Sequence, residues 1–115
     1  MKKIIVSQRI IKNEEYNENR DALDVKWGEF LLELGIIPIV LPSSHGYMVY
    51  FKEFNIEGIL LTGGNNLGAI SNNPLDIKRD LIERQLIEYG INNSIPIIGV
   101  CRGMQIILDY FGYNL

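Results

Sequence analysis

The segment I-G-V-C-R-G-M-Q at residues 98–105 places a potential nucleophile, Cys101, at the junction of two predicted elements. The apolar residues 95–98 predict a buried strand, and the residues after the cysteine predict an amphipathic helix. The apolar positions of that helix recur at i, i+3, i+4 and i+7: Met104, Ile107, Leu108 and Phe111. A strand that turns sharply into a helix with a nucleophile at the corner is a nucleophile elbow. Gly99 and Gly103 flank the cysteine and keep Cβ atoms out of a turn in which a positive φ is expected.

The position of Cys101 favours its reactive form. At a helix N-terminus, unpaired N–H groups and the helix dipole stabilise the thiolate, which is the competent nucleophile. The alternative is that Cys101 is a small buried hydrophobe, as many single cysteines are. Core packing, however, does not require glycines on both sides of a cysteine and gives no reason for Arg102 to follow it. The elbow is therefore our prediction for this segment.

The G-x-C-x-G segment resembles the nucleophile segment of class I glutamine amidotransferases and γ-glutamyl hydrolases. Residues 58–64 form a second similar segment, an apolar run that ends in T-G-G. The family uses such a turn to supply a backbone N–H to its oxyanion hole. A tetrahedral intermediate needs donors aimed at its oxygen, each worth a few kcal/mol. By resemblance, these donors are the N–H groups of Gly64 and Arg102.

The resemblance also implies contacts between the chain and a substrate. Gln105 lies one helical turn past Cys101, and by resemblance Gln105 and Gly63 help to hold a glutamyl group. The alternative for Gln105 is a polar position on the helix surface. Arg9, at the end of the first strand, is in a position to reach an acidic group of the substrate or to lie at the surface.

Residues 73–83, N-P-L-D-I-K-R-D-L-I-E, resemble the P-x-x-D-x-x-R-D-x-x-E segment of the γ-glutamyl-γ-aminobutyrate hydrolase branch. An arginine directly after the cysteine is also common in that branch. Physically, the segment predicts a helix start, with Asn73 as N-cap and a proline at the first helical position. In this interpretation Asp80 and Glu83 belong to a solvated, charged helix face.

The remaining pattern predicts one α/β domain. Near-continuous apolar runs predict strands at residues 3–7, 36–41, 58–61 and 95–98. Amphipathic spacing and helix-ending residues predict helices at about residues 20–34, 49–54 and 74–90, with a polar loop at 64–73. Strands that alternate with helices build a doubly wound, mostly parallel, flavodoxin-like sheet. Gly64 and Cys101 then fall at the carboxyl ends of strands, where such sheets bind ligands.

Composition excludes several classes of protein. The chain has 115 residues, of which 47% are hydrophobic, enough for one core and too little for two domains. A net charge of −3 without a basic cluster argues against nucleic acid as a partner. A single cysteine forms no internal disulfide, which suits a reducing cytoplasm, and no segment is long enough to span a membrane. We expect neither a cofactor nor a metal ion.

A cysteine hydrolase needs a histidine base held by an acid, and the family places both beyond a later strand. The one histidine of this chain is His45, in S-S-H-G, where it is either a loop residue or an unusual base. We therefore expect residues 1–115 to be the N-terminal part of a single glutamine amidotransferase-like domain, truncated after the elbow helix. We expect such a part to turn over negligible substrate, and to be aggregation-prone or only marginally folded unless a complementary C-terminal piece is supplied. Its expected protein partner is either a second copy, in a homo-oligomer, or this complementary C-terminal part.

For the intact protein, the resemblance implies hydrolysis of a γ-glutamyl amide in a small metabolite through a thioester on Cys101. The V-S-Q-R opening and the segment D-V-K-W-G-E-F at residues 24–30 are similar to γ-glutamyl-CDP-amidate hydrolases. γ-Glutamyl-γ-aminobutyrate is a second substrate that the resemblance allows. Two other classes stay open: a glutaminase subunit that delivers ammonia to a synthetase, and a non-catalytic domain.

Overall fold

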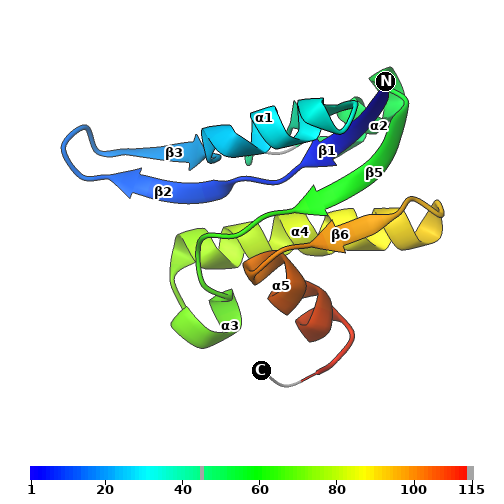
Figure 1. Cartoon of the computed structure of the whole chain (residues 1–115). Coiled ribbons are helices and arrows are strands. Elements are labelled where there is room, and N and C mark those ends of the chain that lie inside the picture. Colours follow the sequence, from blue (N-terminus) through cyan, green and yellow to red (C-terminus); the bar gives the residue numbers. More distant parts are fainter. Residues whose placement is uncertain (45, 114–115) are drawn as a thin grey trace.

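The computed structural model of this chain describes residues 1–44 and 46–113, except for the side chain of Ala69. Its strands are β1 (Lys2–Val6), β2 (Arg9–Asn13), β3 (Glu18–Ala22), β4 (Ile36–Val40), β5 (Ile56–Leu61) and β6 (Ile97–Gly99) (Figure 1). Its helices are α1 (Val25–Glu33), α2 (Tyr47–Glu53), α3 (Gly68–Ser71), α4 (Pro74–Asn92) and α5 (Arg102–Tyr110). None of the described helices is long and apolar enough to cross a bilayer.

Four of the strands form one parallel sheet in the order β4-β1-β5-β6. Ile5 of β1 stands opposite Ile39 of β4 on one side and Ile59 of β5 on the other. Leu61, at the end of β5, stands opposite Gly99 of β6. Helices connect these strands, as parallel pairing requires. The predicted α/β fold with a mostly parallel sheet is therefore confirmed.

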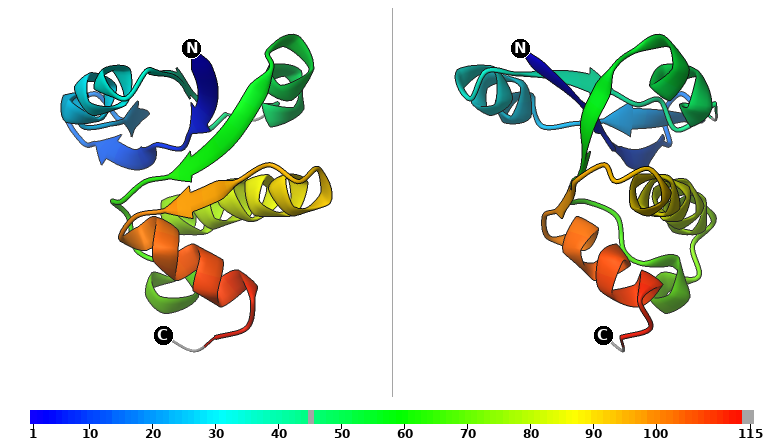
Figure 2. Two further views of the ribbon diagram at one scale, coloured as in Figure 1. Left: turned by 45° about the vertical axis from the view of Figure 1, so that its right-hand side comes forward. Right: turned by 90° about the vertical axis from the view of Figure 1, so that its right-hand side faces the viewer.

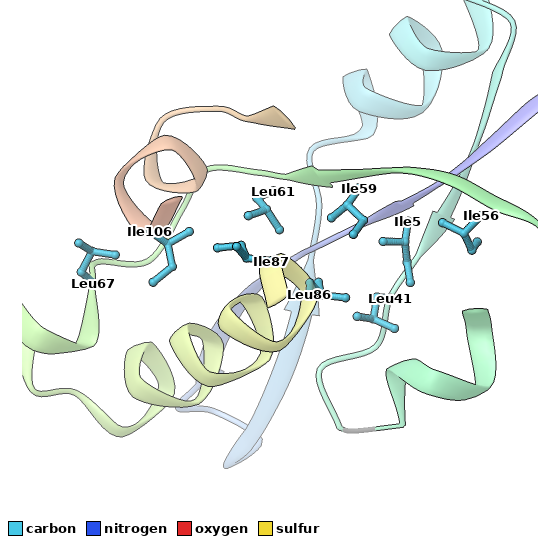
Figure 3. Close-up of a cluster of buried hydrophobic side chains, with 9 residues drawn as sticks. All are labelled: Ile5, Leu41, Ile56, Ile59, Leu61, Leu67, Leu86, Ile87 and Ile106. Atoms are coloured by element: carbon cyan, nitrogen blue, oxygen red, sulfur yellow. The ribbon is translucent and has the colours of Figure 1, made fainter. Parts of the chain in front are cut away.

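The two faces of the sheet carry separate apolar clusters, because successive strand residues point to opposite sides. Ile5, Ile59 and Leu61 face α4 and α5, where they join a cluster of nine buried side chains that includes Leu86 and Ile106 (Figure 3). The opposite face carries a smaller cluster of Val6 and Leu60 packed against Leu31 of α1. Figure 2 shows α1 and α4 on opposite sides of the strands.

The helix predicted to begin at residue 20 was wrong at its start. Residues 18–22 form β3, which pairs with β2 in an antiparallel hairpin that extends away from the main sheet (Figure 1). α1 begins only at Val25, where the side chain of Asp24 accepts a hydrogen bond from Lys26 N at 2.9 Å. The hairpin is rich in charged, exposed residues and lacks the apolar alternation that would mark a strand.

α4 begins as predicted but runs further and buries a different face. Asn73 caps it by accepting a hydrogen bond from Leu75 N at 2.9 Å. The helix does not stop at Gly90, which is buried where the helix packs closely against Ile97 and Ile59. The apolar residues Ile77 and Leu81 are exposed, while charged residues take buried positions on the same helix.

The short helix α3 lies inside the segment that was predicted to be a polar loop. In α5, Ile106 is fully buried, whereas Met104 and Phe111 of the predicted apolar stripe are exposed. Gly103 of α5 packs directly on the end of β5: a Cβ at this position would overlap the carbonyl oxygen of Leu61. Close approach of helix to strand at this point therefore depends on a glycine.

One apolar surface stays open on the face that carries α1. A cavity of about 320 Å³ lies between α1 and the strands β5 and β6. Its lining includes Ile4, Phe30, Leu34, Leu60, Ile98 and Val100. Ile98 is 64% exposed, and within the described residues β6 is an edge strand of the sheet.

We predict that Gly103→Ala lowers the free energy of unfolding by ~1–3 kcal/mol, because the added methyl group must displace β5 or α5. Urea denaturation followed by circular dichroism measures the change in the free energy of unfolding. Gly28→Ala is the matched control, since nothing lies within 4 Å of a Cβ at this helical position. The control should be neutral or stabilising by up to ~1 kcal/mol. Equal effects of the two substitutions would contradict the proposed contact.

We also predict that residues 1–115, prepared alone, self-associate, because an open apolar surface beside an unpaired strand edge favours association. Sedimentation velocity over a tenfold range of concentration measures the distribution of species. Ile98→Lys, which places a charge in the open surface, should shift the distribution toward monomer. A monodisperse monomer with a cooperative thermal transition would show that the open surface does not drive association.

Candidate active site

Cys101 occupies the corner between β6 and α5. It is the N-cap residue of α5, and its carbonyl oxygen accepts a hydrogen bond from Gln105 N at 3.1 Å. Its backbone has φ 55° and ψ −112°, a combination that L-residues rarely adopt. Such strain costs ~1–3 kcal/mol and is concentrated at functional sites. The thiol-bearing residue is exposed, so it is not a buried hydrophobic residue.

The T-G-G turn after β5 lies directly against this corner. Thr62 N donates to Ser7 Oγ at 3.1 Å, and Thr62 Oγ1 donates to Ser7 O at 2.8 Å. These bonds join the ends of β5 and β1. A Cβ built on Gly63 would lie 3.4 Å from the Cβ of Cys101, which is ordinary van der Waals contact. The two segments that the sequence singled out are therefore neighbours.

The β2–β3 hairpin brings Arg9 over the same turn. Gly64 has φ +85°, and a Cβ at this position would lie 2.5 Å from Arg9 Nε. Arg9 is exposed and stands at the start of β2. A pocket of about 190 Å³ lies beside the turn. Its lining includes Arg9, Leu23, Asp24, Trp27, Gly63 and Gly64.

Asn65 attaches the hairpin to the turn through its side chain. Its Oδ1 accepts from Ile10 N, and its Nδ2 donates to Ile10 O, both at 2.8 Å. The amide thus makes the same pair of bonds to Ile10 that a neighbouring strand would make. Ile10 is buried, so this attachment fixes the base of the hairpin and with it the neighbouring Arg9.

A buried arginine, Arg79 of α4, holds the backbone of the T-G-G turn. Its Nη1 donates to the carbonyl oxygens of Gly63 at 2.9 Å and Gly64 at 2.7 Å. Its Nη2 donates to the carbonyl oxygen of Thr62 at 2.8 Å. Three successive carbonyl groups therefore converge on one guanidinium that is 1% exposed.

The carboxylate of Glu83 joins this arginine to the elbow. Its Oε1 accepts from Arg79 Nε at 2.7 Å, and its Oε2 accepts from Arg102 Nη1 at 2.7 Å. The side chain of Arg102 also forms an ion pair with Asp80 and donates from Nε to Asn66 O at 3.2 Å. We call Arg79, Glu83, Arg102 and Asp80 the buried ion network; its two positive and two negative charges balance.

Burial dominates the electrostatics of this network. It raises the pKa of the Asp80 carboxyl, while the Gly68 N–H and the charge of Arg102 act in the opposite direction. Burial also lowers the pKa of the Arg79 guanidinium, and the Glu83 carboxylate opposes this shift. An arginine nevertheless stays charged in proteins. The charged groups of the network are therefore poorly solvated, and they are stabilised by pairing with one another.

The prediction that Asp80 and Glu83 lie on a solvated face was wrong. The side chain of Glu83 is 0% exposed and that of Asp80 13% exposed. The spacing of R-D-x-x-E indicates the ion pair between Arg79 and Glu83, because residues at i and i+4 lie on one helix face. Helix spacing does not reveal, however, that this face turns toward the T-G-G turn.

The structure does not support a role for Gln105, and it does not test His45. Gln105 is exposed on α5, and nothing in its contacts assigns it to a ligand. His45 lies outside the described residues. Among the residues that the structure does describe, no three His, Cys, Asp or Glu side chains gather in a way that could hold a metal ion.

The chain is similar in sequence to several known proteins. The chain is 37% identical over 112 residues to γ-glutamyl-CDP-amidate hydrolase of Campylobacter jejuni. This match covers 96% of this chain and 56% of that protein. It is 37% identical over 96 residues to a putative glutamine amidotransferase of Schizosaccharomyces pombe, covering 76% of this chain and 37% of that protein. It is 34% identical over 61 residues to the glutamine-hydrolyzing GMP synthase of Tolumonas auensis, covering 53% of this chain and 10% of that protein.

The chain thus spans about half of the first of these relatives and less of the others. The family profile of peptidase C26 matches residues 4–115, which include the T-G-G turn, α4 and the elbow. The predicted resemblance to the class I glutamine amidotransferase-like proteins is confirmed by this match and by the 37% identical hydrolase. The chain belongs to the peptidase C26 family.

Proposed function

We propose that the protein hydrolyses a γ-glutamyl amide, with Cys101 as the nucleophile. The observation that carries the proposal is an exposed thiol on a strained N-cap residue, set against the T-G-G turn. Cys101 directly precedes the first residue of α5, and its exposure admits a substrate. The 37% identical relative, whose name is γ-glutamyl-CDP-amidate hydrolase, supports the same reaction class.

In the proposed mechanism, the sulfur of Cys101 attacks the γ-carbonyl carbon, and the carbonyl oxygen becomes an oxyanion. The N–H groups of Gly64 and Arg102 donate to that oxygen. Arg102 is the first residue of α5, so its N–H lies outside the hydrogen-bond ladder of the helix and is free for such a role. Gly63 and Gln105 contact the glutamyl group.

The C–N bond then breaks, and the amine leaves with a proton supplied by a histidine other than His45. The γ-glutamyl group stays on Cys101 as a thioester. Water attacks the thioester, and glutamate leaves while the thiol is restored. Under this proposal, residues 1–115 by themselves turn over negligible substrate.

For the substrate, we propose an amide whose leaving group is anionic, as in γ-glutamyl-CDP-amidate. Arg9 borders the pocket beside Gly64, and a guanidinium pairs well with phosphate oxygens. Trp27 lines the same pocket, and its aromatic face can stack on the nucleobase of a nucleotide leaving group. γ-Aminobutyrate, an amine that carries a carboxylate, is the second leaving group that Arg9 suits.

A glutaminase subunit that supplies ammonia to a synthetase is a second candidate. The match to a GMP synthase named as glutamine-hydrolyzing favours it. Co-purification of a synthetase, and glutaminase activity that depends on it, would support this candidate. Absence of turnover on every γ-glutamyl amide would instead favour a non-catalytic domain.

We predict that Cys101→Ser lowers the turnover of γ-glutamyl-p-nitroanilide by the full-length natural protein at least ~10³-fold, because a serine hydroxyl is a far weaker nucleophile without its own activating base. Release of p-nitroaniline measures the rate. His45→Ala should retain the wild-type rate. Loss of activity in His45→Ala with an intact fold would mean that the base has been misassigned.

We predict that Arg9→Ala raises KM at least ~10-fold for γ-glutamyl amides with an anionic leaving group and leaves the p-nitroanilide nearly unchanged. Steady-state kinetics with the CDP-amidate, the γ-aminobutyrate amide and the p-nitroanilide measure the difference. Lys12→Ala on the same hairpin is the control for a general loss of positive charge. Equal losses on all three substrates would exclude a role for Arg9 in binding the leaving group.

A further inference from the structure

We propose that the buried ion network is a positioning device, in which Arg79 and Glu83 orient the two backbone amides of the oxyanion hole. The inference rests on the proposed function, because it assigns a role to residues that touch no substrate. It concerns α4, an element that contributes no group to the proposed chemistry.

The first step concerns the direction of the Gly64 amide. In a trans peptide unit the N–H points opposite to the preceding carbonyl. Because Arg79 Nη1 holds the Gly63 carbonyl at 2.9 Å, the Gly64 N–H is turned away from Arg79. Two successive glycines give this peptide unit unusual freedom to rotate. The guanidinium removes that freedom by holding the carbonyls on both sides of the Gly64 amide.

The second step concerns the other amide. Arg102 supplies the second proposed N–H through its backbone, and its buried side chain pairs with Glu83 and Asp80 of the network. Glu83 accepts from Arg102 Nη1 with one oxygen and from Arg79 Nε with the other, each at 2.7 Å. One carboxylate therefore fixes the separation between the T-G-G turn and the start of α5.

The third step concerns the reason why α4 places charged residues, Arg79 and Glu83, in a buried position. Buried ion pairs add little net stability compared with apolar side chains of similar volume, since desolvation offsets their attraction. Leu86 and Ile87 of the same helix fill the neighbouring core with apolar groups. Stability alone is thus a weak reason for a buried Arg79 and Glu83. Guanidinium and carboxylate groups, in contrast, fix direction, because each makes several bonds in a planar arrangement.

The test compares Arg79→Lys, Arg79→Met and Glu83→Gln with the wild type, all as the full-length natural protein. Lysine keeps the charge but cannot bond three carbonyl groups in a fork. Arg84→Met is the matched control, since Arg84 lies on the same helix and pairs with Asp109 outside the network. Circular dichroism and thermal unfolding establish that each variant is folded before kinetics are measured.

We expect kcat for γ-glutamyl-p-nitroanilide to fall ~10²-fold or more in the network variants, with KM changed less than ~3-fold. The rate of Cys101 alkylation by iodoacetamide should stay within ~2-fold of the wild type, because direct displacement on this reagent needs no oxyanion hole. Arg84→Met should match the wild type in both measurements. An unchanged kcat, or a fall in kcat matched by an equal fall in alkylation, would overturn the inference.

Crystal structures of the wild type and Arg79→Lys provide a readout that does not depend on activity. We expect the Gly63–Gly64 peptide of the variant to be rotated or to occupy more than one orientation. A single, unchanged orientation would overturn the inference. If the wild type hydrolyses no γ-glutamyl amide, the proposed function fails, and the direction of this peptide still decides whether Arg79 positions it.

Discussion

β5 is the strand on which the rest of the structure depends. It pairs in parallel with β1 and β6, contributes apolar residues to both clusters, and ends in the T-G-G turn. α5 approaches it so closely that only a glycine at position 103 fits against the Leu61 carbonyl. Cys101, the proposed nucleophile, is therefore placed by strand pairing and by one close helix–strand contact. The location of Cys101 follows from the sheet, while its strained backbone follows from the sharp turn that the contact imposes.

The second constraint is electrostatic. Backbone carbonyl groups at the end of β5 point toward α4, and a neutral core would leave them without partners. Arg79 satisfies them, but its own charge then requires Glu83, and Arg102 completes the pairing of that carboxylate. Each buried charge is thus the consequence of the group before it. These bonds run from the T-G-G turn through Arg79 and Glu83 to Arg102, so they link the turn physically to the elbow.

The sequence predicted the parts of the fold that depend on local pattern. The apolar strands, the cap at Asn73 and the elbow at Cys101 each carry a short-range signal, and each is present. The β2–β3 hairpin was missed because most of its residues are polar and exposed, and the one buried side chain of β2, Ile10, is not part of an alternating apolar pattern. The burial of Glu83 was missed for a related reason. Helix periodicity identifies which residues share a face, but the partner that covers the face comes from elsewhere in the chain.

The attachment of the hairpin through Asn65 separates two kinds of change that such a protein can accumulate. The hairpin lies outside the main sheet, so its length or composition can change without altering the register of β1 with β5. Asn65, which bonds both Ile10 and Arg79, connects the hairpin to the buried ion network. Under the proposed function, residues 9–22 can therefore change substrate preference as long as this connection is kept, while the sheet that places Cys101 retains its geometry.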